Sequence, residues 1–182
     1  MSISGITIGL LGGTGEEGRG LALRWARAGA RVVIGSRAAD RARETAEQLN
    51  KLLGADAIGH GDNTRAAQCD FVLLSVPFQH AASTLEAVMP QIRPGATLID
   101  ATVPVSFDRG RASYAEPPEG SASEHLRARL RADIRLVGAF KTIPAHSMEA
   151  LDADLDCDDF VVGDSPDARQ QVIEAMRARS AS

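Results

Sequence analysis

The sequence predicts an α/β fold, with a doubly wound, mostly parallel sheet and helices on both of its faces, in one domain that spans residues 1–182. Three observations predict this fold. A short apolar strand near the N-terminus runs into a glycine-rich turn and then into a helical pattern. Strands and helices alternate through most of the chain after it. Several strands are continuous apolar runs, which are typical of parallel sheets covered on both faces.

The first strand and its turn, residues 5–18, contain a Gly-x-Gly-x-x-Gly pattern at Gly13, Gly15 and Gly18. A helix is expected over residues 19–28, where Gly29 marks its C-terminal end. In such a unit Gly13 permits a tight turn, Gly15 lets backbone approach a pyrophosphate, and Gly18 lets the helix pack closely on the strand. The helix N-terminus offers free N–H groups to the phosphates. The pattern predicts a Rossmann-like dinucleotide site, and a glycine-rich turn without a ligand is the alternative.

The second strand, residues 31–37, indicates which dinucleotide binds. Its tip is Gly35-Ser36-Arg37, and Arg41 follows one turn into the next helix. An NAD site normally carries Asp or Glu at this strand end, to accept hydrogen bonds from the ribose hydroxyls. Here two guanidinium groups and a hydroxyl replace the carboxylate, and they match the geometry of a phosphate. The tip therefore predicts NADP(H), and two solvated surface arginines are the alternative.

The remaining elements are expected in alternating order. Helices are expected at 40–53, 81–92 and 166–179, and strands at 55–60, 70–76, 96–101, 134–140 and 160–163. Residues 102–120 break this rhythm with three prolines, two glycines and few periodic apolar residues. Long loops within a compact domain are often lids or binding loops, so this segment is expected to act as a lid, with disorder as the alternative.

Three strand ends carry a proline at equivalent positions, namely Pro77, Pro104 and Pro144. Proline ends a strand and leaves an apolar wall without N–H donors. Because the carboxyl ends of parallel strands meet at one edge of a sheet, the three walls are expected to converge there. A flat, uncharged ring such as nicotinamide would fit against them.

Composition excludes several other classes of function. A net charge of −4 argues against a nucleic-acid surface, and no apolar run approaches the roughly 20 residues of a membrane span. No signal peptide is recognised, so a cytoplasmic location is expected. Cys69 and Cys157 predict neither a disulfide framework nor a metal site, and the acidic run 152–159 is interpreted as a solvated loop. No Tyr-x-x-x-Lys or other acid–base set is recognised around Tyr114 or elsewhere.

These motifs identify a resemblance. The chain resembles the NADPH-dependent F420 reductases, also called F420:NADP oxidoreductases, over nearly its whole length. The resemblance rests on G-G-T-G-x-x-G-x-G-L-A-L-R from Gly12, V-x-G-S-R from Val33, V-P-F at Val76, V-P-V at Val103, T-I-P-A at Thr142, and E-G-S-A at Glu119. The first two blocks are shared with other NADP proteins, whereas the last two in this order are fairly specific.

The resemblance implies NADP(H) as cofactor, coenzyme F420 as co-substrate, and direct hydride transfer with no catalytic acid or base. It places residues 14–17 along the cofactor phosphates, Phe78 and Ala82 on the NADP side, and Val103, Pro104 and Ala145 around the two rings. The cofactor-binding residues expected in all are Gly13, Thr14, Gly15, Glu16, Glu17, Gly18, Ser36, Arg37, Arg41, Val76, Pro77, Phe78, Ala82, Val103, Pro104 and Ala145. A homodimer is also expected from this family.

Two departures from the family leave alternatives open. The chain is expected to lack the family's C-terminal segment, which contributes to the deazaflavin pocket and the dimer. Lys141 also precedes T-I-P-A where relatives carry His or another polar residue. An NADP-binding sensor or partner-dependent module, and an NADPH-dependent reductase of another small acceptor, therefore remain as alternative functions.

Overall fold

The structure is a computed structural model that describes residues 3, 5–152, 155 and 157–177. Its centre is one six-stranded parallel sheet in the order β3-β2-β1-β4-β5-β8. These strands are β1 (Thr7–Leu11), β2 (Arg31–Ser36), β3 (Ile58–Asp62), β4 (Phe71–Leu74), β5 (Thr97–Asp100) and β8 (Arg135–Gly138). The strand order reverses direction between β1 and β4, as in a doubly wound fold, so the predicted fold class is confirmed.

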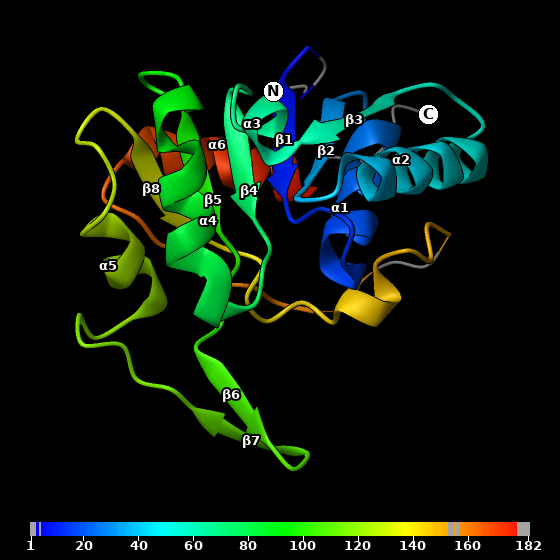
Figure 1. The fold of residues 1–182 in the computed structure, drawn as a ribbon. Coiled ribbons are helices and arrows are strands. Elements are labelled where there is room, and N and C mark those ends of the chain that lie inside the picture. Colours follow the sequence, from blue (N-terminus) through cyan, green and yellow to red (C-terminus); the bar gives the residue numbers. More distant parts are fainter. Residues whose placement is uncertain (1–2, 4, 153–154, 156, 178–182) are drawn as a thin grey trace.

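Helices cover both faces of this sheet (Figure 1). They are α1 (Glu16–Arg27), α2 (Ala39–Leu53), α3 (Asn63–Ala66), α4 (Ala81–Val88), α5 (Ala122–Arg127) and α6 (Pro166–Arg177). Short 3-10 turns complete the connections at η1 (Phe78–His80), η2 (Met89–Gln91) and η3 (Ala145–Ser147). Within the described residues, no helix is both long and apolar enough to cross a membrane.

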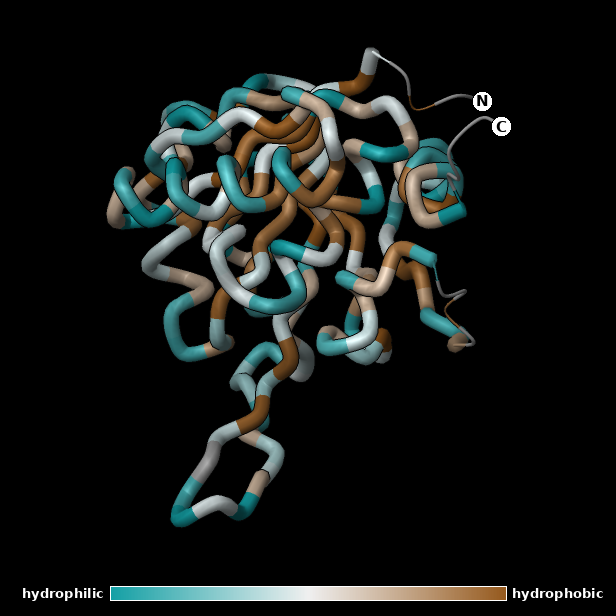
Figure 2. Tube along the Cα trace, turned by 90° about the vertical axis from the view of Figure 1, so that its right-hand side faces the viewer, coloured by the Kyte–Doolittle hydropathy of each residue, from teal (hydrophilic) through white to brown (hydrophobic). Residues whose placement is uncertain are grey.

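The core has two layers because successive strand side chains point to opposite faces of the sheet. On β1, Leu10 packs in one layer with residues of α1, α2 and α6, whereas Leu11 packs in the other with residues of α3, α4 and α5. On β4, Leu73 and Leu74 divide between the layers in the same way. Apolar residues gather in these central strands, while the outward-facing sides of the helices are largely polar (Figure 2).

Several predicted bounds differ from the structure. The helix predicted from Arg19 begins at Glu16, because Gly15 caps it and its carbonyl accepts the Arg19 N–H at 2.9 Å. The third strand begins at Ile58 rather than Ala55, and α3 and α5 were not predicted because each is only one or two turns long. The predicted strand 160–163 is wrong: it is reduced to an isolated antiparallel bridge between Val162 and Gly138.

The segment predicted as a long loop, residues 102–120, contains an antiparallel hairpin. Its strands are β6 (Val105–Asp108) and β7 (Arg111–Tyr114), which pair from Val105–Tyr114 to Asp108–Arg111. The turn between them places Arg109 and Gly110 at φ values of 46° and 80°, the left-handed pair that suits the twist of a tight hairpin. The hairpin projects from the carboxyl edge of the sheet and stands away from the body (Figures 1 and 2).

Candidate functional site

The glycine turn links β1 to α1 and shows three different requirements for glycine. The tight turn was predicted at Gly13. It lies instead at Gly12, which adopts the left-handed conformation (φ 76°). A Cβ on Gly13 would instead meet the Cβ of Leu10 at 2.8 Å, and one on Gly18 would meet the Cα of Gly13 at 2.7 Å. A Cβ on Gly15 would have only the carbonyl oxygen of Gly12 nearby, at 3.9 Å. Packing therefore requires Gly13 and Gly18, whereas the space beside Gly15 is open to a ligand.

The N-terminus of α1 faces this open space with its first N–H groups uncapped. No side chain accepts a hydrogen bond at the cap residue, Gly15. The first helical turn begins with Glu16 and Glu17, which lie beside the half-buried Thr14. Unsatisfied N–H groups and the helix dipole favour a bound anion at this end. The turn therefore has the chemistry to hold a pyrophosphate.

The tip of β2 presents the three residues predicted to recognise a 2′-phosphate. Ser36 is buried and its hydroxyl oxygen accepts the Ala38 N–H at 3.2 Å. Arg37 and Arg41 are exposed, and in the described part of the chain neither guanidinium has a hydrogen-bond or ion-pair partner. The tip is tied to the glycine turn because the Gly13 N–H donates to the Gly35 carbonyl at 3.0 Å. Both cations are thus free to contact an anion next to the turn.

The end of β4 lies against the same turn. A Cβ on Gly12 would clash with Cγ1 of Val76, so the predicted residue Val76 packs against the glycine turn. Pro77 then opens η1, which carries Phe78 and leads into α4 with Ala82 half-buried in its first turn. Val76 is therefore placed beside the glycine turn, and the η1 residues follow it directly in the chain.

The other predicted wall residues come from β5 and β8. Ala145 opens η3, which packs on α1: a Cβ on Gly20 would lie 2.3 Å from the Cβ of Met148 in the turn after η3. Val103 is 43% exposed and Pro104 is half-buried, and both lie at the base of the hairpin. Val76 is thus brought to the glycine turn, Ala145 opens a turn that packs on α1, and Val103 and Pro104 lie at the base of the hairpin.

A polar cluster at the end of β5 was not predicted. Asp100 is fully buried, and its carboxylate accepts from Thr102 N (2.9 Å), Thr102 Oγ1 (2.7 Å), Ser123 Oγ (2.7 Å) and Lys141 Nζ (2.7 Å). Lys141 Nζ also donates to the Thr102 carbonyl at 2.6 Å. The one available signal was an acidic residue closing an otherwise uncharged strand, T-L-I-D. This cluster joins the carboxyl ends of β5 and β8 to the start of α5.

The loop that carries T-I-P-A is held by Asp159, which corrects the prediction that the whole acidic run is solvated. The Asp159 carboxylate accepts the Phe140 N–H in a short hydrogen bond, and it also accepts the Thr142 hydroxyl at 2.9 Å. Phe140 has a φ of 65°, which is unusual for a bulky residue, and its ring meets Trp25 edge to face at 5.5 Å. Asp159 and Trp25 thus stabilise the strained residue that directly precedes Lys141.

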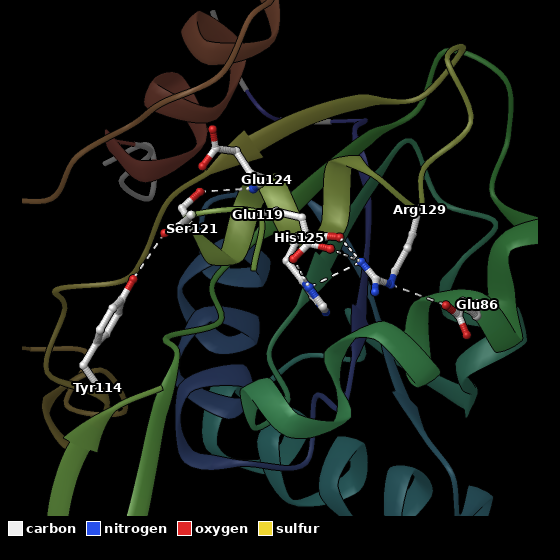
Figure 3. Close-up of polar contacts among 8 residues, drawn as sticks. Glu86, Tyr114, Glu119, Ser121, Glu124, His125 and Arg129 are labelled. Carbon is white, nitrogen blue, oxygen red and sulfur yellow. Dashed lines mark hydrogen bonds and ion pairs between the residues drawn. The ribbon is translucent and has the colours of Figure 1, made fainter. Parts of the chain in front are cut away.

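The connection from the hairpin back to the body contains a second polar cluster (Figure 3). Glu119 lies between His125 Nδ1 (2.7 Å) and Arg129 NH1 (3.1 Å), and these hydrogen bonds lower the pKa of its carboxyl to about 2. On its other side, Arg129 lies 3.6 Å from the carboxylate of Glu86 on α4. The ring of His125 packs on Phe78 with centroids 5.4 Å apart, so the cluster also supports the wall at η1.

Both ends of the segment 114–121 are anchored next to this cluster. The Tyr114 hydroxyl donates to the Gly120 carbonyl at 3.3 Å, and the Ser121 hydroxyl oxygen accepts the Glu124 N–H at 3.1 Å as the N-cap of α5. These contacts are visible in Figure 3. The base of the hairpin is therefore fastened to α5, although its strands project outward.

Glu17 has an unusual electrostatic environment. Its burial raises the pKa of the carboxyl to about 7, with nearby Asp159 and Asp100 adding to the rise and Lys141 opposing it. These interactions place Glu17, on α1, within electrostatic reach of the clusters at the ends of β5 and β8. The site thus combines a helix end suited to an anion with one carboxyl of raised pKa and one ammonium group.

Comparison with known proteins identifies relatives over most of the chain. Residues 7–104 match the family described as NADP oxidoreductase, coenzyme F420-dependent. The chain is 39% identical to the F420-dependent NADP reductase of Methanothermobacter thermautotrophicus, over 92% of this chain and 74% of that protein. It is 33% identical to the protein of the same name from Methanocaldococcus jannaschii, over 92% of this chain and 77% of that one.

A similar fold occurs in solved structures. The structure of a putative F420-dependent NADP-reductase from Arthrobacter sp. FB24 superposes with a TM-score of 0.77 at 21% identity, over 95% of this chain and 80% of that one. The glycerol-3-phosphate dehydrogenase of Coxiella burnetii superposes with a TM-score of 0.71 at 17% identity, over 98% of this chain and 52% of that one. At these identities the likeness shows the fold alone.

Proposed function

Because the chain belongs to the family of coenzyme F420-dependent NADP oxidoreductases, we propose that it transfers a hydride between NADP(H) and the deazaflavin coenzyme F420. The observation that carries this proposal is the identity of 39% to an F420-dependent NADP reductase over 92% of the chain. The geometry of the turn and of the β2 tip supports the NADP half of the reaction, and the apolar strand ends support the meeting of two flat rings.

NADP fits the residues present. The open space beside Gly15 and the uncapped N-terminus of α1 suit a pyrophosphate, because backbone N–H groups can donate to its oxygens without a side chain in the way. Arg37 and Arg41, which have no other partner among the described residues, suit the 2′-phosphate that distinguishes NADP from NAD. When bound, NADPH supplies the hydride.

The protein's contribution to the reaction is positioning. Val76 and Pro77 at β4, Val103 and Pro104 at β5, and Ala145 at η3 offer apolar surface at the carboxyl edge of the sheet. Such surface excludes water from the reacting rings and holds them at contact distance, and proximity of this kind supplies much of the rate enhancement in hydride transfer. No proton has to be removed by a side chain for the hydride itself to move.

The proposal is tested by mixing purified protein with NADPH and oxidised F420 and following the loss of the deazaflavin absorbance. We expect F420 reduction that depends on protein, and much slower reduction with NADH in place of NADPH. Free flavin and ferric citrate serve as alternative acceptors. NADP binding without reduction of any acceptor would favour a sensor or partner-dependent module, and reduction of only another acceptor would favour a different reductase.

We also propose a homodimer in a cytoplasmic setting. An isolated two-stranded hairpin is marginally stable in water, so packing against a second copy would stabilise β6 and β7. Cys69 and Cys157 are both free thiols, which suits a reducing compartment. Light scattering after size-exclusion chromatography measures the mass of the protein in solution. We expect the mass of a dimer for the wild type and of a monomer when residues 106–113 are shortened. A monomeric wild type would contradict the proposal.

A further inference from the structure

Lys141 has a fixed ammonium group. Two of its three N–H bonds point to oxygens, Oδ2 of Asp100 at 2.7 Å and the carbonyl of Thr102 at 2.6 Å. Asp100 is itself fully buried and its carboxylate accepts three further hydrogen bonds. The carboxylate is therefore fixed in position, and it fixes the ammonium that is bound to it. The Lys141 side chain remains 26% exposed, and within the described residues no acceptor takes its third N–H. One N–H is therefore available to a ligand.

One hydrogen bond, one electrostatic interaction and one chain neighbour locate this ammonium relative to the proposed site. Thr102, whose carbonyl it contacts, directly precedes the Val103–Pro104 wall. Glu17, in the first turn of the phosphate-binding helix, interacts electrostatically with it. The residue before it, Phe140, is held in a left-handed conformation by Asp159 and turns the chain at this point. Lys141 therefore lies beside the start of the Val103–Pro104 wall, within electrostatic reach of the first turn of α1.

A buried ion pair is a poor means of joining two strands. Removing two charges from water costs free energy that their attraction repays only with good geometry, and apolar residues of similar volume often replace such pairs without loss. Asp100 thus fixes the position of the Lys141 ammonium, and the exposed part of that group is suited to a ligand. A preorganised cation stabilises negative charge that develops during a reaction, because its own geometry need not change.

We propose that Lys141, fixed by Asp100, is a specificity-determining residue that favours hydride acceptors whose ring becomes anionic. This inference rests on the proposed function. In the reaction a C–H bond breaks at C4 of the dihydronicotinamide, and its electron pair and hydrogen form a C–H bond at C5 of the deazaflavin. The nicotinamide becomes cationic, the pyrimidine end of the deazaflavin gains the negative charge, and one proton from solvent neutralises it. The third N–H of Lys141 donates to the oxygen that carries this charge.

The test compares Lys141→Met, Lys141→Arg and Lys51→Met. Lys51 is the other lysine of the chain and is exposed on α2, so its variant is a matched control. In single-turnover experiments with NADPH and F420, we expect Lys141→Met to slow hydride transfer by about 10²-fold, the usual loss for one donor to a developing oxyanion. Lys141→Arg should recover part of the rate, and Lys51→Met should match the wild type.

Binding supplies a readout that does not depend on turnover. The dissociation constants for oxidised and for reduced F420 are measured in the absence of NADP. We expect the ratio in Lys141→Met to shift against the reduced form by about tenfold, while NADP affinity changes little. The melting temperature of Lys141→Met should fall, because the buried Asp100 loses its cationic partner, and Lys141→Arg should restore it in part. An unchanged rate and ratio in a folded Lys141→Met would overturn the inference and leave the proposed function standing. Absence of F420 reduction by the wild type would instead overturn the proposed function.

Discussion

Gly18 packs directly against Gly13: a Cβ at position 18 would lie 2.7 Å from the Cα of Gly13. The third glycine of the turn, Gly15, has no such neighbour, since the nearest atom to its Cβ would be 3.9 Å away. Two glycines of one motif therefore serve the packing of α1 on β1, and one borders open space in which we propose that the ligand binds. This difference separates effects on folding from effects on binding.

Gly15→Val should fold normally and lose NADP binding. The added side chain occupies the space through which the pyrophosphate would approach the backbone, whereas the nearest protein atom to its Cβ would be 3.9 Å away. Gly18→Ala is the comparison: its Cβ meets backbone atoms that cannot move away cheaply, so we expect a loss of about 1–3 kcal/mol of stability. Circular dichroism melts and an NADP titration measure both. Normal affinity in folded Gly15→Val would mean that the turn is structural.

Arg37→Ala should narrow the preference for NADP over NAD. Its guanidinium is exposed and has no partner in the described part of the chain, so the change removes little from the folded state. One charge-assisted contact to a phosphate is worth about 1.5–3 kcal/mol, which corresponds to a loss of about tenfold to a hundredfold in NADP affinity. NAD affinity should stay the same. Arg43→Ala, which removes a surface ion pair with Asp40 on the same helix, is the control. Equal affinities of the wild type for both dinucleotides would contradict the assignment.

Glu17→Gln should change the pH dependence of stability. The folded protein raises the pKa of Glu17 from 4.5 to about 7, chiefly by burial, so folding favours the protonated carboxyl. Its stabilising contribution is therefore complete below pH 4.5 and is lost as the pH rises to about 7. Melting temperatures across this range should fall more steeply for the wild type than for Glu17→Gln. Parallel curves would show that the pKa of Glu17 is not raised in the folded protein.

NADP should also bind Glu17→Gln more tightly than the wild type above neutral pH, because a negative charge near the phosphates has been removed. NADP titrations of the two proteins at pH 8 measure this difference.

Ala145→Gln should damage turnover far more than NADP affinity. Ala145 opens η3, which packs on α1, so we expect a larger polar side chain there to obstruct the rings and to leave the phosphate contacts at the β2 tip intact. We expect the rate of F420 reduction to fall by at least about tenfold, with the NADP dissociation constant within about twofold. Ala150→Gln, at an exposed position just after η3, is the control. Equal losses in rate and in NADP affinity would place Ala145 in the dinucleotide site.

Local patterns predicted the sheet and the dinucleotide turn. The alternation of apolar strands with amphipathic helices is a short-range signal, and so is the spacing of Gly13, Gly15 and Gly18. The hairpin was missed because its strands are only four residues long and mostly exposed, which leaves no apolar run to detect. The strand expected at 160–163 does not form, because in this segment only Val162 pairs with the backbone of the sheet edge, at Gly138.

The sequence by itself determined the fold class and predicted the dinucleotide preference, because both depend on steric and charge patterns within a few residues of each other. The tertiary structure decided how distant polar residues pair. Lys141 meets Asp100 across 41 positions, and the rings of Phe78 and His125 meet from η1 and α5. Such pairs form because a buried charge or polar group must find a partner wherever the packed chain supplies one. No local pattern specifies that partner, so the fixed ammonium beside the β5 wall became visible only in three dimensions.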